Sequence, residues 1–133
     1  MNQKLDALVA ARVMGWKFVP SVTERVRFRD PQTGIERNIS CAVLPGLCWS
    51  PSTDISAAFD ARDHWLENRP NRSFVLQCQF GQHYQAECWD HALEGGKAGV
   101  GFARGTTDAQ ATCFALLRAV GVPDAEVLKA VES

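Results

Sequence analysis

Three runs of alternating apolar and polar residues follow one another between residues 74 and 102, and they restrict the chain to few folds. Side chains of a strand point alternately to the two faces of a sheet, so each run predicts a strand. Gly81-Gln82 joins the first two runs as a tight hairpin turn, and a polar loop with Gly95-Gly96 joins the second to the third. Connections this short cannot cross over a sheet, so the strands are antiparallel. The apolar positions are Phe74, Leu76, Cys78 and Phe80, then Tyr84, Ala86 and Cys88, then Ala98, Val100 and Phe102.

Two more strands are predicted between residues 22 and 43, joined by the turn Asp30–Gly34. Alternation places Arg25, Arg27 and Arg29 on one face, with Arg37 nearby across the turn. A solvated strand face is the favoured interpretation, and a patch for an anionic ligand is the alternative.

Helices are predicted at about residues 2–15, from Trp49–Ile55 to about Asn68, at 107–121 and at 122–131. The second has the clearest start. Either Ser50 caps it with Pro51 in the first turn, or Ser52 or Thr53 caps it with Asp54 facing the positive end of the dipole. Thr107–Gln110 has the pattern of a capping box.

The predicted order is therefore α-β-β-α-β-β-β-α-α in a single domain, residues 1–133. We expect an α+β fold in which an antiparallel sheet is layered between helices, an α/β/α sandwich. Gly99 and Gly101 leave one face of their strand bare, which indicates close approach of another backbone or a ligand.

Composition narrows the setting. The formal net charge is −1 and hydrophobic residues make up 46%, which is ordinary for a globular domain. Five cysteines form no CxxC pair, and neither a signal peptide nor an apolar run long enough for a membrane span is recognised. We expect a cytoplasmic protein with reduced thiols and no membrane contact.

Two stretches carry a family resemblance. Residues 5–10 running into 13–17, and residues 49–59 with an aromatic at Phe59, resemble the phage ABA-sandwich domain family, small proteins of bacteriophage and prophage genomes. The ending from Thr107 to Cys113 and on to Gly121 is similar to the last helix of that family. The resemblance implies a sheet layered with helices and a phage or prophage origin in a host cell, and it implies no catalytic residues.

Patterns that would indicate catalysis or a metal do not form. Cys78, His83, Cys88 and His91 are spaced like a zinc knuckle, but on strands Cys78 and Cys88 project to one face and His83 to the other. No nucleophile elbow, Cys/His signature or phosphate loop is recognised. We expect no metal, no cofactor and no enzyme activity, and a hydrolase using Asp54 or His91 is the least favoured alternative.

Binding is the favoured function. If the start of the second helix lies near two strand ends, its free N–H groups, an arginine and aromatic rings would form a pocket for a small anionic or nucleotide-like ligand. The competing interpretation is that these residues only cap the helix and complete the core. The candidate ligand-binding residues are Trp49, Ser52, Thr53, Asp54, Trp89, His91 and Arg104.

We therefore expect a non-enzymatic phage-type protein that binds a host protein, or sequesters a small nucleotide-like signal, to counter host defence. The alternative is a nucleic-acid-binding accessory protein of phage replication, because residues 51–121 have the α-β-β-β-α order of a double-stranded-RNA-binding domain. The acidic start Thr107-Asp108 would repel phosphate, and the near-zero net charge also disfavours nucleic acid. The apolar residues of 122–131 are a candidate homodimer surface.

Overall fold

The computed structural model describes residues 3–20, 26–39, 48–79, 83–91 and 99–132. The α+β class and the antiparallel pairing are confirmed, and the chain has one strand more than expected. The elements are α1 (Gln3–Arg12), β1 (Lys17–Val19), β2 (Val26–Arg29), β3 (Glu36–Ile39), α2 (Ile55–Leu66), β4 (Arg72–Gln79), β5 (His83–Asp90), β6 (Gly99–Gly105), α3 (Asp108–Ala119) and α4 (Asp124–Glu132). None of the helices in these ranges combines the length and the hydropathy of a membrane-spanning segment.

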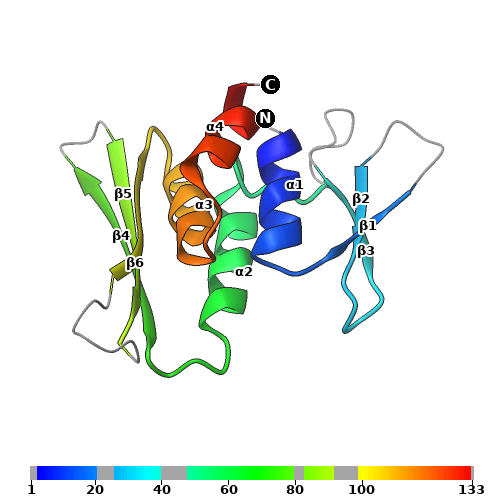
Figure 1. Ribbon diagram of the computed structural model, residues 1–133, viewed down its shortest axis with the longest axis horizontal. Coiled ribbons are helices and arrows are strands. Elements are labelled where there is room, and N and C mark those ends of the chain that lie inside the picture. The colour runs from blue at the N-terminus through cyan, green and yellow to red at the C-terminus, as the bar shows by residue number, and fades with distance from the viewer. Residues whose placement is uncertain (1–2, 21–25, 40–47, 80–82, 92–98, 133) are drawn as a thin grey trace.

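The layering is the reverse of the expected α/β/α sandwich, in which one sheet lies between helices. The strands form two separate three-stranded sheets, ordered β1-β2-β3 and β4-β5-β6, and the helices lie between them (Figure 1). The strands are divided between two sheets because the chain crosses the helical layer along α2. The strands before α2 lie on one side of this layer, and the strands from β4 onward lie on the other. Each sheet therefore covers its own side of the helices.

The sheet β4–β6 packs directly on α3. Its inner face carries apolar side chains from all three strands, among them Leu76, Ala86 and Ala103, which lie in adjacent register. A Cβ atom at Gly101 would lie 2.2 Å from the carbonyl oxygen of Ala115, and one at Gly105 would lie 2.7 Å from the amide nitrogen of Ala111. The close approach of another backbone that the glycines of this strand predicted is that of α3.

The sheet β1–β3 packs on the helices through large side chains. Phe28 of β2 and Ile39 of β3 are buried on its inner face. Trp16 and Trp49 are buried beside them, with ring centroids 4.6 Å apart. The expected hairpin is present, with register pairs Arg29↔Glu36 and Phe28↔Arg37. Paired residues share a face, so Arg37 lies on the inner face with Phe28 and is separated from Arg27 and Arg29, which lie on the outer face with Glu36. Arg25 lies outside the described residues.

The start of α2 differs from both predicted alternatives. Asp54 is the N-cap, and its Oδ1 accepts a hydrogen bond of 3.0 Å from the amide of Ser56. Ser50 to Thr53 form a turn before the helix, in which the carbonyl of Ser50 accepts from the amides of Thr53 and Asp54 at 3.1 and 2.8 Å. Because Ser52 and Thr53 belong to this turn, the helix begins after them and Asp54 is its N-cap. The helix ends at Leu66, slightly before the predicted Asn68, whose φ is 56°.

The predicted cap of α3 is present. Thr107 Oγ1 accepts a hydrogen bond of 3.1 Å from the Gln110 amide, while Gln110 Oε1 accepts 3.0 Å from the amide of Thr106 rather than from the cap residue. Gly15 and Gly121 have φ of 72° and 86°, as expected of residues that end helices.

Candidate functional site

The candidate binding residues separate into two groups on opposite sides of the helical layer. Trp49 and the segment Ser52–Asp54 lie in the connection between β3 and α2. Trp89 and His91 lie at the end of β5, and Arg104 lies on β6, in the other sheet. The single pocket expected from the sequence is therefore not formed by these residues together.

In the first group, Ser52 and Thr53 have local structural roles. The Ser52 amide donates a 2.7 Å hydrogen bond to Oδ1 of the fully buried Asp6 on α1, which fixes the turn before α2 against the first helix. Thr53 Oγ1 donates to the Ser50 carbonyl at 3.5 Å. Both contacts fit the interpretation that this stretch caps and anchors the helix.

The second group lies on the outer face of β4–β6. Trp89 stacks on His91 with centroids 6.2 Å apart and packs against Phe102 at 5.1 Å. Trp89 is paired with Gly99 at one end of β6, whereas Arg104 is paired with Gln85 toward the other end. Trp89 and Arg104 therefore lie at different ends of this face.

A serine and a histidine meet in this second group. Ser73 Oγ lies 3.4 Å from Nε2 of His91, in an exposed position. A serine is activated as a nucleophile when a histidine base lies within hydrogen-bond reach and a third group orients that histidine. The neighbouring carboxylate, Asp90, is in an ion pair of 3.2 Å with Arg72, on the other face of the strand. The arrangement lacks the geometry of an activated nucleophile.

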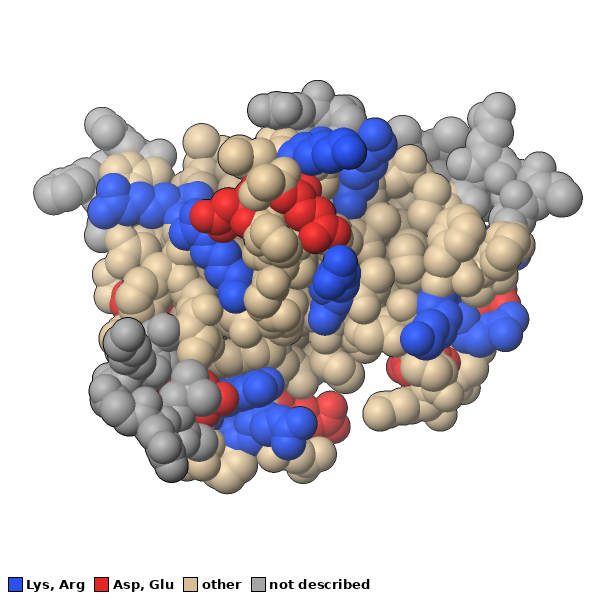
Figure 2. Space-filling model, viewed as in Figure 1, with Lys and Arg blue, Asp and Glu red and all other residues tan. Residues whose placement is uncertain are grey.

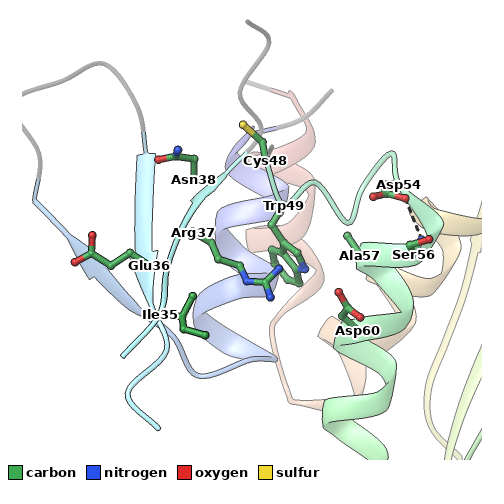
Figure 3. Close-up of a pocket in the computed structure, with 10 residues that line it drawn as sticks. All are labelled: Ile35, Glu36, Arg37, Asn38, Cys48, Trp49, Asp54, Ser56, Ala57 and Asp60. Carbon is green, nitrogen blue, oxygen red and sulfur yellow. Dashed lines mark hydrogen bonds between the residues drawn. The ribbon is translucent and has the colours of Figure 1, made fainter. Parts of the chain in front are cut away.

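The first group borders a cleft of about 350 Å³ between β3 and α2 (Figure 3). In the figure, the side chains of Trp49 and Arg37 lie between the strand and the helix, and the Asp60 carboxylate points toward them from α2. The side chains of Glu36 and Asn38 point away from α2. The lining residues are Ile35, Glu36, Arg37, Asn38, Cys48, Trp49, Asp54, Ser56, Ala57 and Asp60.

The charges around the cleft are mixed, with an excess of carboxylates. Arg37 lies over the ring of Trp16, 5.7 Å from its centroid, and supplies the positive charge. Asp54 and Asp60 supply negative charge from α2. Glu36 is turned to the outer face, where Arg29 approaches its Oε1 at 2.6 Å and holds the pKa of this carboxyl below its usual value. The cleft thus offers to a ligand one guanidinium, the carboxylate of Asp60 and the remaining oxygen of Asp54, whose Oδ1 caps α2.

An unsatisfied donor lies in the wall of the cleft. Trp49 is only 4% exposed, and its Nε1–H has no hydrogen-bond acceptor within the described part of the chain. A buried donor without an acceptor costs about 1–3 kcal/mol. Tryptophan N–H groups usually find a partner when buried. A buried donor in this state calls for an explanation, and an acceptor on a ligand in the cleft would supply one.

Sequence reasoning selected Trp49 and Asp54 but missed Arg37 and Asp60. Arg37 was grouped with the solvated arginines because its register partner was not known, and Asp60 was not singled out. The helical phase of Asp60, six residues after the cap, was visible in the sequence. The position of β3 opposite it was not.

Two of the thiols, those of Cys88 and Cys113, are buried. Burial raises the pKa of Cys88 to about 12 and the pKa of Cys113 well above its ordinary value, so both stay protonated. Cys41 lies outside the described residues. Over the ranges that the structure describes, no three His, Cys, Asp or Glu residues are placed to share a metal ion.

Two apolar residues of α4 are exposed, Leu128 at 59% and Val131 at 37%. A homodimer through this helix stays a prediction.

Comparison with known protein families, curated proteins and solved structures finds no match for this chain. The function is therefore inferred from the geometry of the cleft between β3 and α2.

Proposed function

We propose that this protein acts by binding a partner rather than by catalysis, and that the cleft between β3 and α2 is its binding site. The observation that carries the proposal is the buried indole N–H of Trp49, which lacks an acceptor among the described residues at the wall of a cleft of about 350 Å³. Sites that bind small ligands begin at about this size. This cleft is lined mainly by polar and charged side chains, which suits a ligand with polar or charged groups.

The biological setting comes from the resemblance to the phage ABA-sandwich family. We propose a phage or prophage protein in the cytoplasm of a host cell, whose partner is a host protein or a small host molecule connected with defence. The resemblance supports this setting, and the site supports binding.

Nucleic acid is the less favoured partner. On the face shown in Figure 2, basic and acidic side chains are interspersed. Arg27 and Arg29 share the outer face of their hairpin, but Glu36 lies within 3.9 Å and 2.6 Å of them and offsets their charge. Binding without sequence preference needs several unneutralised cations along one surface. Affinity for RNA or DNA that falls steeply with added salt would favour this alternative.

Nuclear magnetic resonance tests the site directly. The chain has 4 tryptophans, and each indole N–H gives its own signal in a ¹H–¹⁵N spectrum of the labelled protein. Substitution of Trp49 by Phe assigns the Trp49 signal, and substitution of Trp89 by Phe assigns the control on the other sheet. The protein is then titrated with pools of nucleotides, amino acids and short blocked peptides.

The expected result is a pool that shifts the Trp49 signal and leaves the Trp89 signal unchanged, with the same pool raising the melting temperature. Ligands that shift only Trp89 would move the binding site to the outer face of β4–β6. A Trp49 signal that no pool affects would contradict the proposal.

A further inference from the structure

We infer that the occupant of the cleft is an extended peptide segment of a partner protein that carries a basic side chain and lies alongside β3. This inference deepens the proposed function and rests on it. It depends on the edge of β3, on the charges of α2 and on the indole of Trp49.

The edge of β3 faces the cleft with its backbone. β3 is an outer strand of its sheet, with β2 on its other side. The side chains of Glu36 and Asn38 point away from α2 (Figure 3), although both residues line the cleft. Backbone groups of alternate residues in a strand point to the same side. The carbonyl of Asn38 points to this side, because it accepts a 2.9 Å hydrogen bond from the Trp49 amide, and Glu36 presents its amide and carbonyl to the same side.

The chain itself shows that this edge accepts an added strand. Trp49 forms an isolated parallel bridge with Ile39, at the end of β3. In the described residues, this bridge occupies only the end of the edge, and the stretch at Glu36 borders the cleft. A peptide that continued the pairing would gain main-chain hydrogen bonds, the general mode of recognition by strand addition.

The side chains opposite the edge select the charge of the peptide. Asp54 and Asp60 line the α2 side, and Arg37 is the one positive side chain among the described lining residues. Two carboxylates favour a lysine or arginine side chain, and they disfavour the phosphate groups of a nucleotide. Arg37 is exposed and can donate to a peptide carbonyl. The Trp49 N–H is buried, so a peptide carbonyl reaches it only if side chains in the wall of the cleft move on binding. A peptide carbonyl would then supply the acceptor that this N–H lacks.

The size of the cleft agrees with a segment rather than a folded domain. About 350 Å³ is at the small end of the range for ligand sites. An extended chain enters it with one or two side chains while the rest of the partner remains outside.

The test uses blocked tripeptides of the form acetyl-Gly-X-Gly-amide, with X as Arg, Gln or Glu, and a separate titration with ATP. The 133-residue protein is observed through the Trp49 indole signal and through the backbone signals of Glu36 and Asn38. The Arg peptide should bind most tightly and shift all three signals, the Gln peptide should bind more weakly, and the Glu peptide most weakly.

Two variants separate specific recognition from general attraction. Asp60→Asn should weaken binding of the Arg peptide by up to about fivefold, the upper range for one exposed ion pair, and leave the Gln peptide unchanged. Asp63→Asn removes a carboxylate of the same helix that pairs with Arg62 and does not line this cleft, so it should leave both affinities unchanged.

The outcomes distinguish the two levels of proposal. ATP that shifts Trp49 while the peptides do not would overturn the peptide inference and leave the cleft as a binding site. Peptides that bind without preference for Arg, or equally to the wild type and Asp60→Asn, would overturn the assignment of a basic segment. A Trp49 signal unaffected by peptides and ATP alike would overturn the inference. The titration with the wider pools of nucleotides, amino acids and peptides then tests whether the cleft binds any ligand.

Discussion

The two sheets lie on opposite sides of the same helices, yet they meet those helices in different ways. The strands β4 and β5 have 8 residues each and β6 has 7, and this sheet lies flat against α3. The strands β1, β2 and β3 have 3, 4 and 4 residues, and the sheet that they form meets the helices through large aromatic side chains.

The contact of β6 with α3 is between backbones. Gly101 and Gly105 have no side chains, and the helix presents Ala111, Ala115 and Ala119 to them at helical spacing. Small residues on both sides let the sheet and the helix approach until no space remains between them. The result is close packing between β6 and α3, and the cavities on this side lie beside that contact, next to Ala103, Arg104 and Arg118.

The contact of β1–β3 is between side chains. Trp16 and Trp49 pack between this sheet and the helices, and they hold the strand and α2 far enough apart to leave the cleft. The same protein thus combines a tightly packed sheet with one that is held off by indole rings. The difference lies in the packing, which is between backbones at the first sheet and through large side chains at the second.

The largest expected effect comes from filling the space between β6 and α3. In Gly101→Ala, the new Cβ would meet the Ala115 carbonyl oxygen at 2.2 Å, and neither backbone can move without disturbing its own element. We expect the free energy of unfolding to fall by about 3 kcal/mol or more. Urea denaturation followed by circular dichroism measures it.

The matched control is Gly34, in the turn between β2 and β3 of the other sheet. Gly34 has φ of 74° and no atom within 4 Å of the position that an alanine methyl group would take, so Gly34→Ala adds only conformational strain of about 1 kcal/mol. Equal losses in the two variants would show that β6 and α3 are not in close contact.

The next effect concerns the contact that joins the two sides. Asp6 of α1 is fully buried and accepts from the amide of Ser52 at 2.7 Å, in the connection that runs from β3 to α2. Asp6→Ala leaves that amide without its acceptor and should lower the free energy of unfolding by about 2–3 kcal/mol. Asp6→Asn keeps an acceptor oxygen and should lose about 1 kcal/mol. A larger loss for Asn than for Ala in thermal and urea unfolding would contradict this role.

Hydrogen exchange compares the sheets without any substitution. Because β1–β3 is short and is supported through a few aromatic residues, we expect it to open locally while β4–β6 remains folded. Amides of β2 and β3 should exchange at least about tenfold faster than those in the middle of β4 and β5, which corresponds to about 1.4 kcal/mol less protection. Uniform protection across both sheets would remove the distinction between them.

A smaller effect tests the cost of the unsatisfied indole. Trp49→Phe removes packing area but also removes the buried N–H without an acceptor, so the two contributions oppose each other. We expect a change of less than about 1 kcal/mol in the free energy of unfolding. Trp65 is equally buried, at 4% exposure, and its ring is covered by Arg72 at 4.7 Å. Trp65→Phe should therefore lose more, about 2 kcal/mol. A greater loss at Trp49 would mean that its N–H is satisfied in solution.

Much of the fold was predictable, because it depends on local patterns. Alternation in β4–β6 and the capping sequence Thr107–Gln110 act within a few residues, and both gave elements that the structure contains. Gly101 predicted a close approach, and the structure identifies α3 as the partner. The division into two sheets was not predictable, since nothing local in the sequence states on which side of the helices each hairpin packs.

The site was predictable only in part, for the same reason. Trp49 and Asp54 belong to the most recognisable stretch of the chain, and both line the cleft. Trp89, His91 and Arg104 were added because they follow strand ends, but which strand ends meet is a property of the tertiary fold. The face of Arg37 was left open, because alternation gives the faces of one strand and does not give the register between two.

The smallest effect is a pH dependence confined to the hairpin β2–β3. The hydrogen bond from Arg29 lowers the pKa of Glu36 below its ordinary value of 4.5. A carboxyl whose pKa is lowered by folding stabilises the folded state above its unfolded pKa, and this contribution is lost as the pH falls through the folded value. A carbon-detected titration should therefore give Glu36 a pKa below 4.5, and backbone signals of β2 and β3 should report loosening below that pH while those of β4 and β5 do not. The variant Glu36→Gln should lose the part of this transition that Glu36 contributes, while the part from Asp30, whose pKa is lowered by the hydrogen bond from the Gln32 amide, should remain. High salt should weaken the Glu36 part in the wild type. A Glu36 pKa at or above 4.5 would show that Arg29 does not hold this carboxyl in solution. The outer face of β1–β3 would then carry a free basic charge in place of the ion pair between Arg29 and Glu36.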